Sequence, residues 1–248
     1  MRISISKISA YLDCPRKYWY IYEIGVETPK SEGFYFGSAI HSGLENYYSG
    51  KDPMEAVKKA LFGKKVSIGE QVKEGIDLNK LLYEARRIFE IYPDKAPYFN
   101  PLLVEHYFRV PLVHPETKEK LSCLFSGKMD LVTNNAEIVD HKTAKSSPGN
   151  YFEAQNNRQA NGYACAYWTM FGKLPAKFIF NNIIIGNTKR EPSFEQKVLR
   201  PTLGDLCFFF DTAKQVVDAI IRKETRDFPN QNSCKWCQYK SICEYAKK

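Results

Sequence analysis

The sequence predicts an α/β fold in which a mixed central sheet is flanked by helices. Three observations lead to this class. Helical patterns fill residues 1–100, strand patterns dominate residues 101–200, and one helical pattern inside the second stretch returns the chain to a further strand. No internal repeat or low-complexity tract divides the chain. We therefore expect a single domain over residues 1–248, completed by a helix and a cysteine-rich tail within residues 201–248.

Four helices are expected before residue 100. They span residues 4–22, residues 34–48, a segment that opens at Asp52-Pro53, and residues 79–92, which end at Pro93. Aspartate is a good N-cap and proline fits the first helical turn, so the third helix has a well-marked start. In the first helix the candidate buried positions are Ile5, Ile8, Leu12, Tyr18 and Trp19. Residues 63–75 have the least pattern and predict a mobile loop.

Apolar and β-branched residues after Pro101 indicate a block of strands. The expected strands cover residues 103–113, 121–125, 128–133, 136–142, 177–185 and 194–199, with helices over residues 150–171 and 205–222. Asn134-Asn135 marks a turn between two of the strands. A helix that crosses back to a further strand is typical of a mixed sheet.

The composition is that of a soluble protein with an anionic partner. Hydrophobic residues make up 44% and charged residues 26%, which excludes a disordered chain or a fibrous repeat. Lys and Arg number 36 against 28 Asp and Glu, and the resulting charge of +8 favours a nucleic-acid partner. We expect a cytoplasmic protein without membrane contact, because no apolar run approaches about 20 residues and residues 1–7 lack a signal-peptide pattern. Seven cysteines, an odd number, argue against a disulfide framework.

Two aspartates and a lysine form the most informative pattern. Asp140 and Lys142 are two positions apart on an expected strand, so both side chains project from one face. Apolar residues lead into Asp130 and Asp140, so both carboxylates are expected at a buried sheet, where they need a partner or a metal ion. A lysine beside such a metal suits phosphodiester hydrolysis, and oxygen ligands favour Mg²⁺ or Mn²⁺. The alternative is a surface salt bridge between Asp140 and Lys142, with Asp130 in a turn.

The separation of the two aspartates also predicts the turn between them. Asp130 and Asp140 are an even number of positions apart, so an antiparallel hairpin sets them opposite each other only when its loop has an odd length. We therefore expect the three-residue loop Asn134-Asn135-Ala136, or a β-bulge, in place of a two-residue turn.

Two further features point to the same site. His41 lies in an expected helix rich in small residues, which can approach a sheet closely, and its imidazole would complete a carboxylate site and favour Mn²⁺. Gln159 and Tyr163 share one helical face, where they suit hydrogen bonding and stacking with nucleic acid. Each feature alone also fits an ordinary core or interface residue.

Taken together, these residues resemble a known family. The order Gly37-x3-His41, Gly127-x2-Asp130, Asp140-x-Lys142 and Gln159-x3-Tyr163 is similar to that of the RecB-type branch of the PD-(D/E)XK nucleases, from about residue 6 to the C-terminus. The resemblance implies a restriction-endonuclease-like fold. One departure is Met129, which stands before Asp130 where the superfamily's name has a proline.

The resemblance also implies roles for individual residues. The metal ligands would be His41, Asp130, Asp140 and the main-chain carbonyl of His141. Lys142 would be the catalytic lysine, and Gln159 with Tyr163 would contact DNA. Glu105 stands where some relatives carry an additional acidic residue, although a glutamate near a strand edge is usually solvated.

Four cysteines predict a second metal site, which would join the two ends of the chain. Cys234, Cys237 and Cys243 lie together in the tail, and Cys14 is the candidate for a fourth ligand. Four thiolates suit either Zn²⁺ or a [4Fe-4S] cluster. AddB-type helicase-nucleases and CRISPR-associated nucleases of the same branch carry one N-terminal and three C-terminal cysteines, so the resemblance favours the iron-sulfur cluster. The remaining cysteines, Cys123, Cys165 and Cys207, are expected to be packing residues.

The combined pattern predicts a metal-dependent DNA nuclease, an exonuclease on single-stranded DNA or DNA ends. The alternatives are a non-catalytic DNA-binding or assembly module on the same fold, and a zinc-stabilised binding protein. The resemblance implies a helicase, recombination or CRISPR-adaptation partner beside DNA. Candidate contacts to the DNA backbone are Arg16, Lys17, Arg158, Lys235, Lys240, Lys247 and Lys248.

Overall fold

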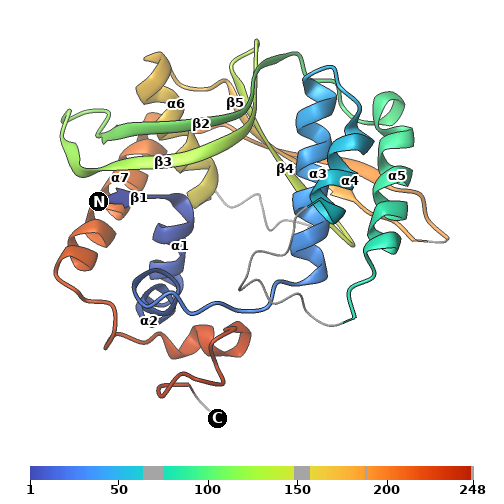
Figure 1. The fold of residues 1–248 in the computed structure, drawn as a ribbon. Coiled ribbons are helices and arrows are strands. Elements are labelled where there is room, and N and C mark those ends of the chain that lie inside the picture. The colour runs from blue at the N-terminus through green and yellow to red at the C-terminus, as the bar shows by residue number, and fades with distance from the viewer. Residues whose placement is uncertain (64–74, 148–156, 188, 247–248) are drawn as a thin grey trace.

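The fold is built on one bent, mixed β-sheet (Figure 1). The computed structural model describes residues 1–63, 75–147, 157–187 and 189–246. Within these residues the strands are β1 (Arg2–Ile3), β2 (Pro101–Val113), β3 (Lys120–Thr133), β4 (Glu137–Ala144), β5 (Lys177–Ile184) and β6 (Ser193–Leu199). The strands β2 to β6 pair in sequence order, and the short β1 lies beside β3. Because β1–β3 and β4–β5 are parallel while the other pairs are antiparallel, the predicted mixed sheet is confirmed.

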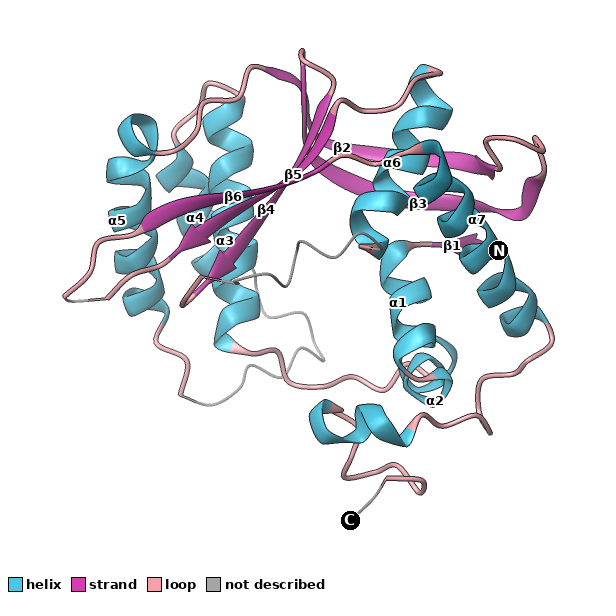
Figure 2. Ribbon diagram, turned by 180° about the vertical axis from the view of Figure 1, so that it is seen from behind, coloured by secondary structure: helices cyan, strands magenta, loops and turns pink. Residues whose placement is uncertain are grey.

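Helices cover the two faces of this sheet (Figure 2). The helices are α1 (Ile5–Asp13), α2 (Pro15–Tyr18), α3 (Glu32–Tyr48), α4 (Pro53–Phe62), α5 (Leu78–Lys95), α6 (Arg158–Phe171) and α7 (Leu203–Ile221). Phe178 and Phe180 of β5 pack in a core with α6 and α7, whereas Ile183 packs in a second core with α3, α4 and α5. Alternate side chains of β5 therefore pack against the helices on opposite faces of the sheet. None of the described helices is both long and apolar enough to cross a lipid bilayer.

The first expected helix is broken near its middle. Helix α1 ends at Asp13, and the chain continues as α2 and a π-turn at Trp19–Glu23. Proline disfavours a helical conformation in the residue before it, and Cys14, before Pro15, is extended with φ −167° and ψ 118°. Ile8 and Tyr18 are buried as predicted, but the prediction for Leu12 is wrong because its side chain is 38% exposed.

Three other element boundaries differ from the prediction. Helix α5 continues through Pro93 to Lys95, because the proline lies in the last turn, where little of the helix remains to be disrupted. The two strands expected at 121–125 and 128–133 are one strand, β3. Gly127 lies inside it because the Phe108 ring, 2.7 Å from the position of a Cβ atom, occupies the space of a side chain. The two-residue strand β1 was not predicted. The loop expected at 63–75 and the start of the helix expected at 150–171 lie largely outside the described residues.

The tail of the chain returns to its beginning. After α7, a 3₁₀ turn at Gln231–Trp236 and the segment that follows pack beside α1 and α2 (Figure 1). Tyr20 donates a hydrogen bond to the carbonyl of Ile242 at 3.2 Å and stacks on Tyr239 with ring centroids 5.1 Å apart. The expected meeting of the two chain ends is therefore present in the fold.

Candidate functional site

The turn between β3 and β4 has the odd length that the sequence predicted. Leu131 pairs with Val139 and Val132 with Ile138, which leaves Asn134-Asn135-Ala136 as the loop. Ala136 adopts a left-handed φ of 60°, as the last residue of a three-residue hairpin loop commonly does. The prediction of a three-residue loop is confirmed.

The same register, extended by one residue, sets Asp130 opposite Asp140. The β3–β4 ladder stops at this point, and the Asp130 carboxylate accepts a hydrogen bond from the His141 N–H at 2.8 Å. A side chain thus replaces the main-chain acceptor where β3 and β4 separate. Figures 1 and 2 show the sheet turning sharply here, with β4 and β5 crossing away from β2 and β3.

Three potential ligand groups gather at this bend from three different elements. His41 of α3, Glu105 of β2 and Asp130 of β3 each offer a ligand atom, and these atoms lie within 4.8 Å of one another. His41 Nδ1 is 3.4 Å from Asp130 Oδ2 and 4.0 Å from Glu105 Oε1. Helix α3 can approach β4 closely because Gly37 has no side chain. Even a Cβ atom at this position would lie 3.4 Å from the Thr143 hydroxyl oxygen. His41 is accessible at 31% of its side chain, while the Asp130 side chain is only 10% exposed.

Glu105 reaches the site through an unusual backbone conformation. Its φ is 49°, a left-handed value that a glutamate rarely adopts. The neighbouring ladder pairs Val104–Leu131 and His106–Met129 keep one register, so Glu105 stands opposite Asp130. Its side chain is 8% exposed, and Lys128 Nζ contacts Glu105 Oε2. Because the side chain is buried, the solvated strand-edge position considered for Glu105 is wrong. Backbone strain of this kind is concentrated at functional sites.

Asp140 lies beside this group, bound to two other side chains. Lys142 Nζ contacts Asp140 Oδ2, and Gln159 of α6 donates a hydrogen bond to Asp140 Oδ1 at 2.6 Å. Asp140 is only 5% exposed, whereas Lys142 is 32% exposed. The pair is therefore part of the buried site, and the alternative of an ordinary surface salt bridge is wrong. Within the described residues, Asp140 is not a member of the compact group around His41.

The two aspartates have opposite electrostatic environments. Burial alone would raise the pKa of Asp130, but the hydrogen bond and charge of His41 outweigh it and bring this pKa to about 2. Burial also dominates at Asp140, where Lys142 offsets it only in part and the negative Asp130 adds to it, so the pKa rises to about 6. The pKa of His41 is raised, because its contact with Asp130 outweighs the effect of burial. The fold thus favours the ionised form of Asp130, whereas ionisation of the buried Asp140 is energetically unfavourable.

The side chain of His141 lies beside the ligand group, with its ring edge-on to that of His41 at a centroid distance of 6.3 Å, but its polar contact is elsewhere. It is buried, with Nδ1 3.0 Å from Asn181 Nδ2 and its ring stacked 5.8 Å from that of Tyr48. Burial lowers the pKa of His141 to about 4, so the imidazole is neutral. Only its main chain takes part in the site, through the N–H bound to Asp130, and a role for its carbonyl stays a prediction.

Tyr163 lies one helical turn beyond Gln159 and packs under the site. Its ring meets Phe108 edge-on with centroids 5.8 Å apart, and it approaches β3 at Gly127, where a Cβ would be 3.3 Å from the Tyr163 ring. Burial, and then the negative charge of Asp140, raise its pKa. The structure places Gln159 and Tyr163 together at the site, and their contact with DNA stays a prediction.

The candidate DNA-backbone cations are distributed differently from expectation. Arg16 is 5% exposed, binds Glu244 at 2.7 Å and the Arg226 carbonyl at 3.0 Å, and packs on Trp19. It fastens the tail to the N-terminal helices, so its prediction as a phosphate contact is wrong. Lys17 and Arg158 both pair with Asp13, at 3.3 and 3.4 Å. Lys235 and Lys240 are in the tail, while Lys247 and Lys248 lie outside the described residues.

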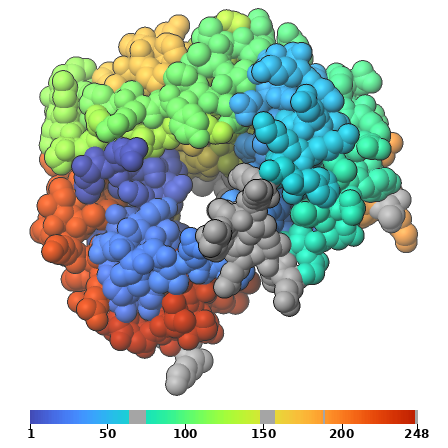
Figure 3. All heavy atoms as spheres, viewed as in Figure 1, coloured from blue at the N-terminus to red at the C-terminus, as the bar shows by residue number. Residues whose placement is uncertain are grey.

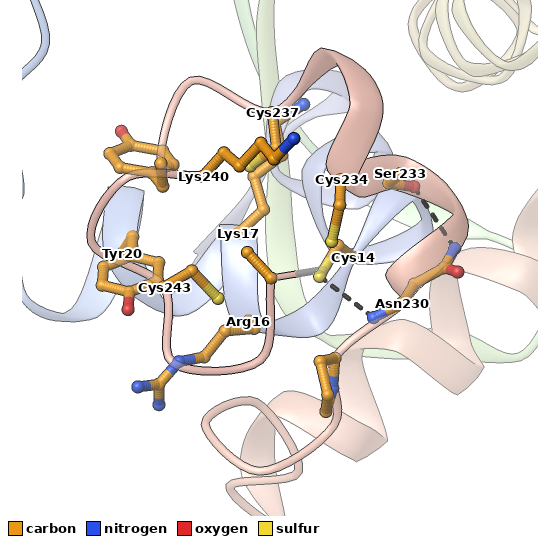
Figure 4. Close-up of a pocket in the computed structure, with 13 residues that line it drawn as sticks. Cys14, Arg16, Lys17, Tyr20, Asn230, Ser233, Cys234, Cys237, Lys240 and Cys243 are labelled. Carbon is orange, nitrogen blue, oxygen red and sulfur yellow. Dashed lines mark hydrogen bonds between the residues drawn. The ribbon is translucent and has the colours of Figure 1, made fainter. Parts of the chain in front are cut away.

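The four predicted cluster cysteines line one pocket (Figure 4). Cys14 comes from the break between α1 and α2, and Cys234, Cys237 and Cys243 come from the tail. Cys14 Sγ accepts a hydrogen bond from the Asn230 N–H at 3.2 Å, which fixes the tail beside it. Of the other cysteines, Cys123 and Cys165 are buried as expected, and Cys207 is half-buried.

Figure 3 shows an opening near the centre of the view, beside the N-terminal helices. Carboxylates, an imidazole and a lysine gathered at the bend of a mixed sheet define a hydrolase of the nuclease class, since such groups suit phosphodiester cleavage. The comparison with protein families agrees: the model for the PD-(D/E)XK nuclease superfamily matches residues 2–244, and the chain belongs to that superfamily.

Solved structures support the fold. The chain is similar to a candidate exonuclease from Eubacterium rectale, with a TM-score of 0.62, 15% identity, and coverage of 100% of this chain and 90% of that one. This likeness shows a shared restriction-endonuclease-like fold. The protein SSO0001 aligns with a TM-score of 0.41 and 13% identity over 98% of this chain and 94% of its own, a likeness too low to bear on the fold. No curated protein matches the sequence.

Proposed function

We propose that this nuclease is a divalent-metal-dependent deoxyribonuclease that acts on single-stranded DNA or on DNA ends. The observation that carries the proposal is the convergence of His41, Glu105 and Asp130 beside the Asp140–Lys142 pair. These side chains come from α3, β2, β3 and β4, and a packing requirement alone would not gather three potential ligands and a lysine around one buried bend. The net charge of +8 supports a polyanionic substrate.

The donor set fits Mg²⁺ or Mn²⁺. Two carboxylates and an imidazole within 4.8 Å of one another are hard or borderline ligands, and the imidazole favours Mn²⁺. Asp140 lies on the lysine side of this group, and its raised pKa reports a carboxylate that lacks full compensation. A bound divalent cation would polarise the scissile phosphate and lower the pKa of the attacking water.

The neighbouring side chains have separate tasks in the proposed reaction. Gln159 holds Asp140 by its Oδ1 atom, which fixes the carboxylate that in turn holds the Lys142 ammonium group. Lys142 is the more accessible member of the pair, so its Nζ can donate hydrogen bonds to the attacking water or to a phosphoryl oxygen. The positive charge there opposes the negative charge that develops on the phosphate.

A matched pair of lysine variants tests this proposal. Lys142→Ala should reduce Mn²⁺-dependent cleavage of labelled single-stranded DNA by at least about 100-fold, since it removes a donor to the developing charge. Lys177→Ala is the control, because Lys177 of β5 forms a similar pair with Glu137 at 2.9 Å on the same sheet. Glu137 lies on β4, three positions before Asp140. End-blocked and polarity-labelled substrates distinguish exonuclease from endonuclease action. The proposal is wrong if Lys142→Ala cleaves as well as Lys177→Ala.

We also propose that the cysteine pocket holds a [4Fe-4S] cluster. One thiol comes from the break between α1 and α2 and three come from the tail, and all four line the same pocket. Four thiolates suit a cluster in which each binds a different iron atom, and the resemblance to iron-sulfur nucleases favours this cluster over zinc.

Cysteine variants test the cluster independently of activity. Anaerobically purified protein should absorb near 400 nm, and Cys14→Ser or Cys243→Ser should lose this absorbance and lower the melting temperature, because the tether between the chain ends is lost. Cys207→Ser is the control, since Cys207 is half-buried outside the pocket. A colourless protein with stoichiometric zinc would contradict the cluster. A cytoplasmic location stays a prediction from the lack of a signal-peptide pattern and of a long apolar run. A helicase, recombination or CRISPR-adaptation partner stays a prediction from the resemblance.

A further inference from the structure

One face of the β2–β3 ribbon is open to solvent. Helices α6 and α7 lie against its other face, where Phe108 and Phe125 are buried (Figures 1 and 2). In the view of Figure 3, atoms of β2 and β3 lie at the surface above the N-terminal helices. Tyr107 and Arg109 alternate with the buried Phe108 and therefore point to the open face, where the Tyr107 side chain is 77% exposed. A tyrosine so exposed is available to a ligand.

A chain of contacts joins this tyrosine to the metal-ligand group. Tyr107 and Lys128 are paired across β2 and β3, and Lys128 Nζ lies 5.4 Å from the centre of the Tyr107 ring. The same Nζ atom contacts Glu105 Oε2, and Glu105 belongs to the group with His41 and Asp130. Only the Lys128 side chain therefore separates the exposed Tyr107 ring from the proposed cleavage site.

The chemistry of this face suits one class of ligand. An exposed aromatic ring offers a surface on which a base stacks, whatever its identity, and cations beside it bind the phosphates. Lys128 and Arg109 supply two cations on β3 and β2, and Arg2 of β1 supplies a third beside Leu124 of β3. Alternate residues of a strand are about 7 Å apart, so Tyr107 and Arg109 are neighbours on the open face. A base in a duplex is already stacked and paired, so an unpaired base is the better occupant.

We propose that the open face of β2–β3 binds single-stranded nucleic acid next to the scissile phosphate, with a base stacked on Tyr107 and the backbone against Lys128 and Arg109. This proposal rests on the proposed nuclease function and deepens it. It assigns the preference for unpaired strands to one ring on this chain.

Binding of a fluorescent oligothymidylate, measured in EDTA so that no cleavage occurs, tests the stacking. Tyr107→Ala should weaken binding about 5- to 150-fold, the range for loss of one base–aromatic stack. Tyr107→Phe keeps the ring and should bind within twofold of the wild type. An abasic strand of the same length keeps the charge but has no base, so Tyr107→Ala should bind it as well as the wild type does. Lys128→Gln should reduce the salt dependence by about one phosphate contact.

A matched tyrosine separates this site from a general surface effect. Tyr98 is 83% exposed and precedes β2, so Tyr98→Ala should leave oligothymidylate binding unchanged. The proposal is overturned if Tyr107→Ala has no effect, if it weakens the abasic strand equally, or if blunt duplex binding falls by the same factor. The two proposals fail separately, because the binding assay contains no metal and the Lys142→Ala assay reads cleavage alone.

Discussion

Replacing Asp140 with asparagine should make the metal-free protein more stable at pH 8, although it should abolish cleavage. The reason is the environment of the carboxylate. Burial raises the pKa of Asp140 from its ordinary value of 3.8 to about 6, even with Lys142 in contact. The ionised side chain is therefore less favourable in the folded protein than in the unfolded chain, and a neutral amide of the same shape removes that cost.

The size and pH range of this effect follow from the pKa. A difference between 3.8 and about 6, at about 1.36 kcal/mol per pH unit, corresponds to about 3 kcal/mol. The folded-state pKa is the higher one, so the penalty is absent below pH 3.8, develops as the pH rises towards 6, and is constant above it. The advantage of Asp140→Asn should accordingly be near its full value at pH 8 and small at pH 4.

Asp130→Asn should do the opposite. Contact with His41 overcomes burial and holds the pKa of Asp130 at about 2, so the ionised carboxylate stabilises the fold by about 2 kcal/mol above pH 3.8 as long as His41 is protonated. That stability is lost as the pH falls towards 2, and it also declines as the pH rises through the raised pKa of His41. Asp130→Asn should therefore be destabilised by about 2 kcal/mol at pH 4 and by less at pH 8.

Anaerobic urea unfolding in EDTA at pH 4 and pH 8 measures both variants against the wild type. Mn²⁺ added in excess over EDTA should then stabilise the wild type more than Asp140→Asn, which has lost one negative charge beside the ligand group, because a ligand that binds only the folded state stabilises it by mass action. If Asp140→Asn is destabilised at pH 8 as much as Asp130→Asn, burial is not what sets the pKa of Asp140, and the proposed division between the two carboxylates fails.

Two further predictions concern residues around the site. Glu105→Gln should lower Mn²⁺ affinity at least about tenfold in a calorimetric titration, since it removes one negative ligand; equal affinity would exclude Glu105 from the metal site. Gly162→Ala should cost about 1–3 kcal/mol in urea unfolding, because its Cβ would lie 2.1 Å from the Ile5 side chain and 2.8 Å from that of Phe209. Gly33→Ala, which meets only the Ser31 hydroxyl at 3.8 Å, is the control and should be neutral or stabilising.

Local chemistry explains what the sequence could reveal. The parity of Asp130 and Asp140 predicted the hairpin loop, because side chains alternate along a strand whatever surrounds it. Asp52 and Pro53 predicted the start of α4, where the Asp52 side chain accepts the Met54 N–H at 2.8 Å. These features depend on residues close together in the chain, and the structure agrees with them.

Long-range packing explains what the sequence could not reveal. Glu105 has a left-handed conformation opposite Asp130, and no neighbouring residue in the sequence indicates it. Arg16 carries a charge that suggested an exposed phosphate contact, yet its partner Glu244 is 228 positions away. The sequence predicted two strands at 121–125 and 128–133 in place of one, and the Phe108 ring that occupies the space beside Gly127 is known only from the fold.

The contact between the two ends of the chain also constrains how the protein can fold during synthesis. Arg16 and Tyr20 take their hydrogen-bonding partners from Glu244 and Ile242, so these buried groups wait until more than 220 further residues have been synthesised. Contacts at such sequence separation form slowly, because a long loop must close before they contribute any stability. The nascent helices α1 and α2 therefore emerge without their final neighbours, which the segment around residues 242–244 supplies later in synthesis.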